Sequence, residues 1–354
     1  MLKFFTDKYN WNWILKDKFE KYYDTYFLWE YFNIYEENYD CKKELIFFED
    51  ENIIVFWPHL VRKISNIKWL EMYNNYYDCT TPYWYWGPLL IKKTSEYDSS
   101  LKKFFNDYQR YCLKQNYVTE FIRFHPVYEN YKDFENITNI SKINNVVVLN
   151  LKKDIEEIWM KSLTWKRRNQ IRREKKMVDE ILIKNNLAED EISEFLKIYY
   201  DTMKKNNSSK KYFFSFNFIK SHLKLNSFIS IETRKENNIL SQSLFFWNWE
   251  IFHYHLSATN YTLWYWTSSL ILWEAIKYAK NKWYKYFMLW WWTSWDKNDS
   301  LYKFKKSFWG EDKEFHVWKI LFNNKLYYKL NSILNLNNDN NFFPKYRENY
   351  NLLI

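Results

Sequence analysis

The spacing of apolar residues predicts mixed helices and strands in the first half of the chain. Helical spacing covers residues 1–40, and residues 101–115 form an amphipathic helical pattern that Ser99 or Ser100 could cap. Two apolar runs on either side of Glu51-Asn52 predict a hairpin, and further strand patterns follow the amphipathic helix. This order predicts an α+β domain over residues 1–150.

The second half begins with helical and basic segments and continues with a run of strands. A helical pattern then leads into a strand, and one more strand and a helix are predicted after Lys319. We therefore predict a second domain over residues 151–335 and a polar tail over 336–354, where asparagines gather. The predicted helices are 154–162, 190–206, 215–225 and 267–281, and the strands are 179–184, 227–234, 239–246, 250–259 and 284–289.

Glycine and tryptophan occur in abnormal numbers. The chain has 2 Gly and 21 Trp in 354 residues, whereas roughly 25 glycines are expected from average usage. The two counts together come close to that expectation. Some bacteria read the UGA codon as glycine, and translation with a table that reads it as tryptophan would exchange the two residues. We therefore interpret most of these tryptophans as glycines of the natural protein.

Individual positions favour the same interpretation. Trp249 lies between two strand patterns, where a hairpin turn favours glycine. Trp283 follows a helical pattern at the place of a C-terminal glycine cap. Residues 290–292 are three consecutive tryptophans, and glycines there would form an ordinary loop. Trp13, Trp159 and Trp273 lie inside helical patterns and fit genuine indoles.

Charge and cysteine content narrow the class of protein. The net charge of +10 points to an anionic partner, although scattered lysines also fit an AT-rich genome. The three cysteines are far apart and odd in number, which favours a reducing compartment. No apolar run approaches the ~20 residues of a membrane span, and the N-terminus lacks a signal-peptide core. We expect a cytoplasmic protein without a bound metal or cofactor.

The segment TPYWYWGP offers the first candidate binding loop. With glycine at the two tryptophan positions, its backbone amides could approach a ligand closely, and its tyrosines could stack on it. A packed Gly/Pro turn is the alternative. The candidate residues are Tyr83, Trp84, Tyr85, Trp86 and Gly87.

A basic segment at 166–173 offers a second candidate. Arg168 and Arg172 are four residues apart and would share one face of a helix, where their guanidinium groups could bind phosphate. A run of charges is usually a solvated helix face, and this is the alternative explanation of the segment.

Two further candidate segments lie near the end of the second half. The segment LWYWTS precedes a helix, and the amides at a helix start form an anion site suited to a pyrophosphate. A second loop follows the last strand and leads to Lys305, which could stabilise a developing oxyanion. The candidate donor-binding residues are Trp264, Trp266, Thr267, Ser268, Trp291, Trp292 and Thr293.

With tryptophan read as glycine, four ordered motifs resemble the Fem-type aminoacyl- and acyltransferases of the GNAT acetyltransferase superfamily. The resemblance spans about residues 50–330 and rests on TPYWYWGP, KRRNQIRR, HYHLSATN and LWWWTSWDKNDSLYKFKKSFWGE. It implies two tandem GNAT-like domains, each a mixed curved sheet flanked by helices. It also places Tyr83, Tyr85, Gly87, Arg168 and Arg172 at an acceptor site. The Phe304-Lys305 pair would lie near the donor channel, with Lys305 as the catalytic group.

The resemblance implies transfer from aminoacyl-tRNA or acyl-CoA to an amine of a nucleotide- or lipid-linked peptidoglycan precursor. Partners would then be that precursor, possible tRNA and a possible peripheral membrane contact, although no long heptad pair suggests a coiled-coil arm for tRNA. Two alternatives remain open. Basic and aromatic residues could bind nucleic acid without catalysis, and genuine surface tryptophans could bind carbohydrate.

Overall fold

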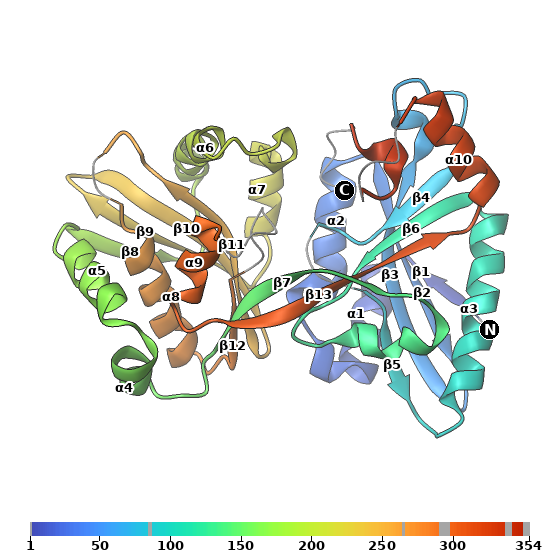
Figure 1. Ribbon diagram of the computed structural model, residues 1–354, viewed down its shortest axis with the longest axis horizontal. Coiled ribbons are helices and arrows are strands. Elements are labelled where there is room, and N and C mark those ends of the chain that lie inside the picture. The colour runs from blue at the N-terminus through green and yellow to red at the C-terminus, as the bar shows by residue number, and fades with distance from the viewer. Residues whose placement is uncertain (1, 84–86, 264–265, 290–297, 337–341, 350–354) are drawn as a thin grey trace. The chain divides into compact units, whose positions relative to one another are not determined.

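The computed structural model describes residues 2–83, 87–263, 266–289, 298–336 and 342–349. The chain folds into two compact units (Figure 1). Unit 1 comprises residues 1–143 and 315–354, and unit 2 comprises residues 144–314. None of the helices in the described part is both long and apolar enough to cross a lipid bilayer.

The units divide the chain at different points from the predicted domains, because the C-terminal region returns to unit 1. Strand β13 (Glu311–Leu321) pairs with β6 (Tyr117–Arg123) in an antiparallel register, with Val317 opposite Arg123. Helix α10 (Asn324–Ile333) then buries Leu330 in an apolar cluster of unit 1. Residues 315–335 therefore complete unit 1 rather than the second domain.

The region predicted as a polar tail also contributes to the core of unit 1. Tyr346 is only 2% exposed and its hydroxyl lies 2.8 Å from Thr119 Oγ1. Residues 342–349 thus pack against the sheet, because an aromatic ring and a buried arginine follow the asparagine-rich stretch. The asparagines at 337–341 lie outside the described residues.

Unit 1 is built on a mixed sheet in the order β1-β2-β3-β4-β6-β13, with β5 paired to β3. The pair β4–β6 is parallel and the other pairs are antiparallel. The predicted hairpin is confirmed, since Glu49 pairs with Ile54 and Asp50 Oδ1 accepts hydrogen bonds from the Asn52 and Ile53 amides. The remaining strands are β1 (Lys3–Phe5), β2 (Cys41–Glu49), β3 (Ile53–Lys63), β4 (Tyr77–Thr80) and β5 (Leu89–Lys92).

Helix α3 (Tyr97–Lys114) supplies much of the core of unit 1. Its apolar stripe, with Leu101, Phe104 and Tyr108, packs on Trp57 of β3. The helix begins two or three residues before the predicted caps, because Ser99 and Ser100 already lie in its first turn. The other helical segments are α1 (Lys8–Lys18), η1 (Glu20–Tyr22), η2 (Thr25–Phe27), α2 (Trp29–Asn38), η3 (Ile64–Asn66), η4 (Asn130–Asp133), η5 (Glu135–Ile137) and η8 (Lys345–Arg347).

Unit 2 has a second mixed sheet in the order β7-β12-β11-β10-β9-β8. Here β11 and β12 run parallel, and the other pairs are antiparallel. The register of β10 and β11 shifts between Leu244 and Phe245, which marks a β-bulge. The strands are β7 (Ser141–Asn150), β8 (Glu180–Lys184), β9 (Phe228–Lys235), β10 (Asn238–Asn248), β11 (Ile251–Thr259) and β12 (Tyr286–Met288).

Helices pack on both faces of this sheet (Figure 1). Helix α8 (Ser268–Asn281) buries Leu270, Leu272 and Ile276 against sheet residues such as Phe245 and Phe252. Helix α6 (Glu189–Lys205) packs on β11, where Thr202 Oγ1 donates to the Thr259 carbonyl at 3.1 Å. The other helical segments are α4 (Ile155–Glu157), the π-helical turn η6 (Ile158–Ser162), α5 (Trp165–Lys175), η7 (Lys210–Tyr212), α7 (Phe216–Leu223) and α9 (Ser300–Lys306).

Candidate functional site

The predicted acceptor loop of unit 1 is anchored at both of its described ends. Trp84, Tyr85 and Trp86 lie outside the described residues. Tyr83 is 8% exposed, and its carbonyl accepts a hydrogen bond from the Tyr35 hydroxyl at 3.3 Å. Gly87 has φ +75°, and a Cβ there would lie 2.7 Å from Phe124 Cδ1. Only glycine fits this position without displacing the Phe124 ring.

Asn130, which the sequence did not single out, holds this loop against the following segment. Its Nδ2 donates to the Pro88 carbonyl at 3.0 Å, and its Oδ1 accepts from the His125 amide at 2.8 Å. The side chain is 1% exposed. A single asparagine gives no sequence signal for such a role, because asparagine is abundant throughout this chain.

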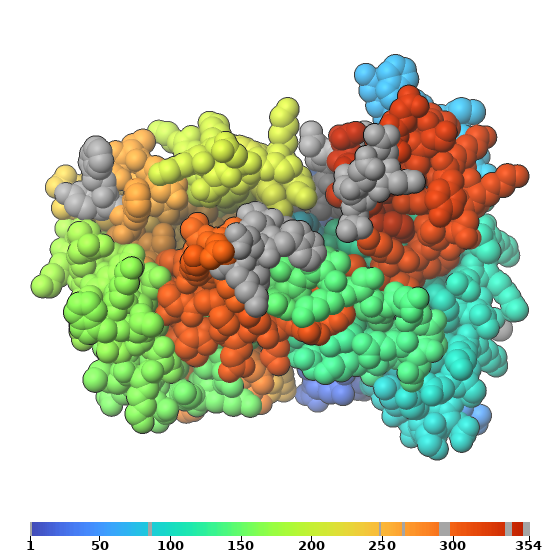
Figure 2. All heavy atoms as spheres, viewed as in Figure 1, coloured from blue at the N-terminus to red at the C-terminus, as the bar shows by residue number. Residues whose placement is uncertain are grey.

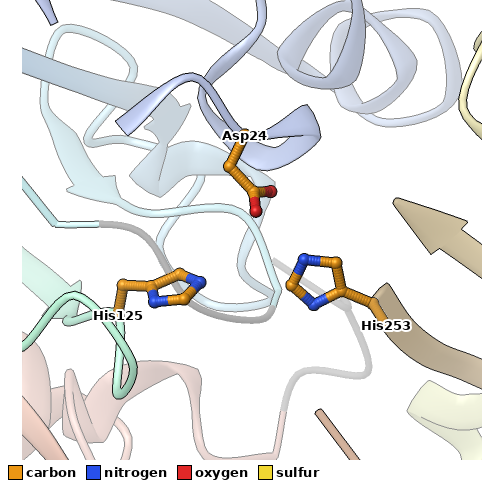
Figure 3. A group of neighbouring side chains, drawn as sticks. All are labelled: Asp24, His125 and His253. Atoms are coloured by element: carbon orange, nitrogen blue, oxygen red, sulfur yellow. The ribbon is translucent and has the colours of Figure 1, made fainter. Parts of the chain in front are cut away.

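Figure 3 shows two more polar side chains of unit 1, Asp24 and His125. Asp24 Oδ1 accepts from the Tyr26 amide at 3.0 Å and thereby caps η2. His125 Nδ1 accepts from the amides of Val127 and Tyr128, each at 3.2 Å. Both side chains therefore shape local turns. The third labelled side chain, His253, belongs to β11 of unit 2.

The two arginines predicted to bind phosphate are engaged by the protein itself. Arg168 Nη1 donates to the carbonyls of Trp159, Met160 and Leu163 at 2.7–3.0 Å, and so satisfies the carbonyl end of the preceding helical turn. Arg172 Nη1 donates to Asn169 Oδ1 at 3.1 Å, and its guanidinium lies 5.4 Å from the Trp159 ring centroid. Arg172 remains exposed.

Arg167, one residue earlier, connects three helices of unit 2. It is 9% exposed. Its Nε and Nη2 donate to Ser307 Oγ after α9, and its Nη1 donates to Ser269 Oγ on α8 at 2.6 Å. The guanidinium also lies 4.8 Å from the Phe304 ring centroid. The 3.6-residue period alone could have identified this arginine, because it shares the buried side of α5 with Ile171.

The predicted anion site at the start of α8 already holds a carboxylate. Leu270 N donates to Glu174 Oε2 at 2.7 Å, and burial raises the pKa of Glu174. Thr267 N donates to Ser241 Oγ at 3.4 Å, and Ser268 Oγ lies 3.3 Å from Thr259 Oγ1. A phosphate at this helix start would thus meet a nearby carboxylate.

Trp264, Trp291, Trp292 and Thr293 lie outside the described residues. Trp266 is 57% exposed, and its ring centroid lies 5.8 Å from that of Tyr261.

Lys305 is the buried cation of α9. It is 3% exposed, and burial lowers its pKa to about 7, although Asp299 partly opposes the shift. Asp299 caps the helix by accepting from the amides of Leu301 and Tyr302. At the other end, Ser307 Oγ donates to the Phe304 carbonyl at 2.6 Å. A lysine held in this way can be either protonated or neutral near neutral pH.

The chain is similar to known proteins in its structure and not in its sequence. No protein-family model and no curated protein sequence matches the chain. The structure is similar to that of FemX, with a TM-score of 0.63 and 11% identity over 86% of this chain and 93% of that one. It is also similar to L-PGS from Bacillus licheniformis, with a TM-score of 0.55 and 10% identity over 92% and 95%.

A conserved protein of unknown function from Bacteroides thetaiotaomicron VPI-5482 gives a TM-score of 0.52 and 13% identity over 82% of this chain and 89% of that one. At these identities the likeness concerns the fold alone. The predicted fold class is confirmed as a mixed α+β fold in two units, and this fold is similar to that of FemX.

Proposed function

We propose that this protein transfers an aminoacyl or acyl group to an amine of a peptidoglycan precursor. The donor would be an aminoacyl-tRNA or an acyl-CoA, and the precursor would be nucleotide- or lipid-linked. The observation that carries the proposal is the burial of Lys305, with its pKa lowered to about 7. The fold shared with FemX and the four Fem-type motifs support the same class of reaction.

In the proposed reaction the neutral acceptor amine attacks the ester or thioester carbonyl of the donor directly. The C–N bond forms, the carbonyl oxygen gains negative charge, and the alcohol or thiol then leaves as the amine loses a proton. Protonated Lys305 would stabilise the oxyanion, because an ammonium group in a dry environment interacts strongly with developing charge. Arg167 would position α9 through its hydrogen bonds to Ser307 and Ser269.

The test compares two lysines of one helix. Lys305→Met removes the buried ammonium, whereas Lys303→Met removes an exposed one whose partner is Asn298. With aminoacyl-tRNA or acyl-CoA and a peptidoglycan-precursor amine, we expect the first variant to lose about 10²–10³-fold in kcat and the second to retain activity. Absence of turnover with every donor, together with salt-sensitive nucleic-acid binding unaffected by Lys305→Met, would support the nucleic-acid alternative instead.

We also propose that several tryptophans are glycines in the natural protein. The support comes from backbone conformation, since Trp69, Trp249, Trp283 and Trp309 all have φ between 39° and 76°. Trp249 is the first residue of the two-residue turn between β10 and β11, a position that takes glycine in a type II′ turn.

Trp283 lies one residue past the C-cap of α8 and is 88% exposed. Its amide donates to the Lys280 carbonyl, and the Tyr284 amide donates to the Ala279 carbonyl, which is the Schellman pattern. Glycine is the usual residue at this position because it alone adopts positive φ without strain. Other tryptophans are well suited to their sites: Trp57 is fully buried and donates to Glu120 Oε1 at 3.0 Å.

A further inference from the structure

A single buried side chain, Asn130, joins two backbone segments of unit 1. Its Nδ2 donates to the Pro88 carbonyl at 3.0 Å, and its Oδ1 accepts from the His125 amide at 2.8 Å. Figure 2 shows the residues that follow, 132–141, in green on the surface of unit 1, whereas Asn130 itself is only 1% exposed. A side chain buried to this extent acts on its backbone partners and does not reach a ligand in solution.

The turn that carries Asn130 is fixed by hydrogen bonds of its own. His125 Nδ1 accepts from the Val127 amide at 3.2 Å. The Glu129 amide donates to the His125 carbonyl at 2.9 Å, and Glu129 has φ 51°. Because these bonds lie within the turn, the turn gives Asn130 a fixed place from which to hold the other segment.

Gly87, one of the residues predicted to bind the acceptor, lies against the same side chain. It has φ +75°, and a Cβ at this position would lie 3.0 Å from Asn130 Nδ2 and 2.7 Å from Phe124 Cδ1. This residue is glycine in the printed sequence, so the close contact does not depend on how any tryptophan is read. Contact with two side chains therefore fixes the backbone of Gly87, and a hydrogen bond fixes that of Pro88.

Tyr83, which is also predicted to bind the acceptor, is held by its backbone as well. Its carbonyl accepts from the Tyr35 hydroxyl at 3.3 Å, and Tyr35 is fully buried in α2. Two residues earlier, Thr81 Oγ1 accepts from the Arg123 amide at 3.2 Å. Backbone that is fixed before a ligand arrives loses less entropy on binding, and the affinity for the ligand is higher for that reason.

We propose that Asn130 is a positioning residue that sets the affinity for the acceptor. It would hold Gly87 and Pro88 in the backbone conformation that binds the precursor, without touching the precursor itself. This inference rests on the proposed function, which supplies the class of acceptor. An asparagine with a purely structural role would affect the stability of unit 1 and leave the affinity for the acceptor unchanged.

The experiment measures binding of a nucleotide-linked muramyl pentapeptide to the full chain by calorimetry, with no donor present. Asn130→Asp retains an oxygen for the His125 amide and loses the N–H group that donates to Pro88. At about pH 8 we expect the Kd to rise about tenfold, because the Pro88 carbonyl then faces a carboxylate and has no donor. In turnover, the KM for the acceptor should rise by the same factor, whereas kcat and the KM for the donor should change less than about twofold.

Protonation of the new carboxyl group should restore the missing hydrogen bond. Burial raises the pKa of a carboxyl group, and a protonated carboxyl group donates through its O–H while its other oxygen still accepts. The ratio of the variant's Kd to the parent's should therefore fall from about tenfold at about pH 8 to about twofold at about pH 5. Comparison with the parent at each pH removes the effect of protonating the acceptor amine.

A matched control removes a different buried hydrogen bond of unit 1. Tyr346→Phe deletes the hydroxyl that lies 2.8 Å from Thr119 Oγ1. It should change the acceptor Kd less than about twofold, because distant sites act independently. Tyr35→Phe, which removes the donor to the Tyr83 carbonyl, should raise the Kd about threefold and gives a second measurement if Asn130→Asp does not fold. Melting temperatures show which variants fold.

The results separate this inference from the proposed function. If the parent binds the acceptor and Asn130→Asp binds it equally well at both pH values, Asn130 has no positioning role and the proposed function stands. An equal loss in Asn130→Asp and Tyr346→Phe would also overturn the inference, because lost stability alone would then explain it. Absence of acceptor binding by the parent would contradict the proposed acceptor, and this inference with it.

Discussion

Arg347 donates from Nε to Asp78 Oδ2 at 2.6 Å, and so ties the C-terminal segment to strand β4. The other oxygen of Asp78 accepts from Arg62 Nε, also at 2.6 Å. All three residues are at most 4% exposed. One buried carboxylate is therefore the shared counter-charge of two guanidinium groups. Loss of the Asp78 charge would leave both arginines without it.

We predict that Asp78→Asn lowers the free energy of unfolding by about 3–5 kcal/mol, because two buried guanidinium groups lose their shared counter-charge. Urea denaturation measures the change. Adding Arg347→Met should recover part of the loss, since it removes one of the two uncompensated charges. If the two substitutions are simply additive, the C-terminal segment is not held by this contact.

His59 makes the stability of unit 1 dependent on pH. Burial by itself would lower the pKa of this histidine, but its hydrogen bonds with Glu120 and Glu44 outweigh burial and raise the pKa from 6.5 to about 9. The stabilisation that protonated His59 gives to the folded protein is fully present below pH 6.5 and is lost as the pH rises through about 9.

We predict that His59→Gln destabilises the protein by about 3–5 kcal/mol near pH 7, because Glu44 and Glu120 lose the cation between them. The difference from the parent protein should shrink as the pH rises to about 9, where the parent's histidine loses its proton. Denaturation midpoints across this range measure the difference. A difference that does not change with pH would mean that His59 is neutral in the folded protein.

Lys305 should make the protein more stable as the pH rises, whereas His59 makes it less stable. Its pKa is about 7 in the folded protein against an ordinary value of 10.5, so the unfolded chain binds more protons between these values and stability rises with pH. Lys305→Met should therefore be more stable than the parent by at least about 1 kcal/mol at pH 7. The gain should fade towards pH 10.5. A variant that is less stable at every pH would show that burial of this ammonium is not costly.

The tryptophans at positive φ should tolerate glycine. Trp249→Gly and Trp283→Gly should each stabilise the protein by about 1 kcal/mol, because glycine adopts the left-handed conformation without strain. Trp57→Gly should instead destabilise it by at least about 3–5 kcal/mol through loss of a fully buried ring. Denaturation midpoints check all three. Peptide mass spectrometry of the native protein would identify the residues directly, and indoles at 249 and 283 would contradict the recoding.

Local patterns predicted local structure well in this chain. The hairpin at Glu51-Asn52 and the end of α8 before Trp283 follow from short-range rules for turns and caps. The return of β13 to β6 could not be predicted, because strand pairing between distant segments leaves no periodic signal. The same holds for the burial of Tyr346.

Individual side chains of the candidate site were harder to predict. The basic stretch predicted Arg168 and Arg172 as binding residues, but the arginine that is buried in this helix is Arg167. Asn130 and His59 act through partners far away in the sequence, such as Pro88 and Glu120. Lys305 was singled out by its motif, and the structure adds the physical property that matters, its burial.

The most direct test of the proposed transfer is the pH dependence of kcat/KM for the parent protein and for Lys305→Arg. In the parent, the rate should rise with pH while the acceptor amine loses its proton, and level off above about pH 7, where Lys305 also loses its proton. In Lys305→Arg the residual rate should continue to rise, because arginine stays charged. The same profile in both proteins would contradict a catalytic role for Lys305.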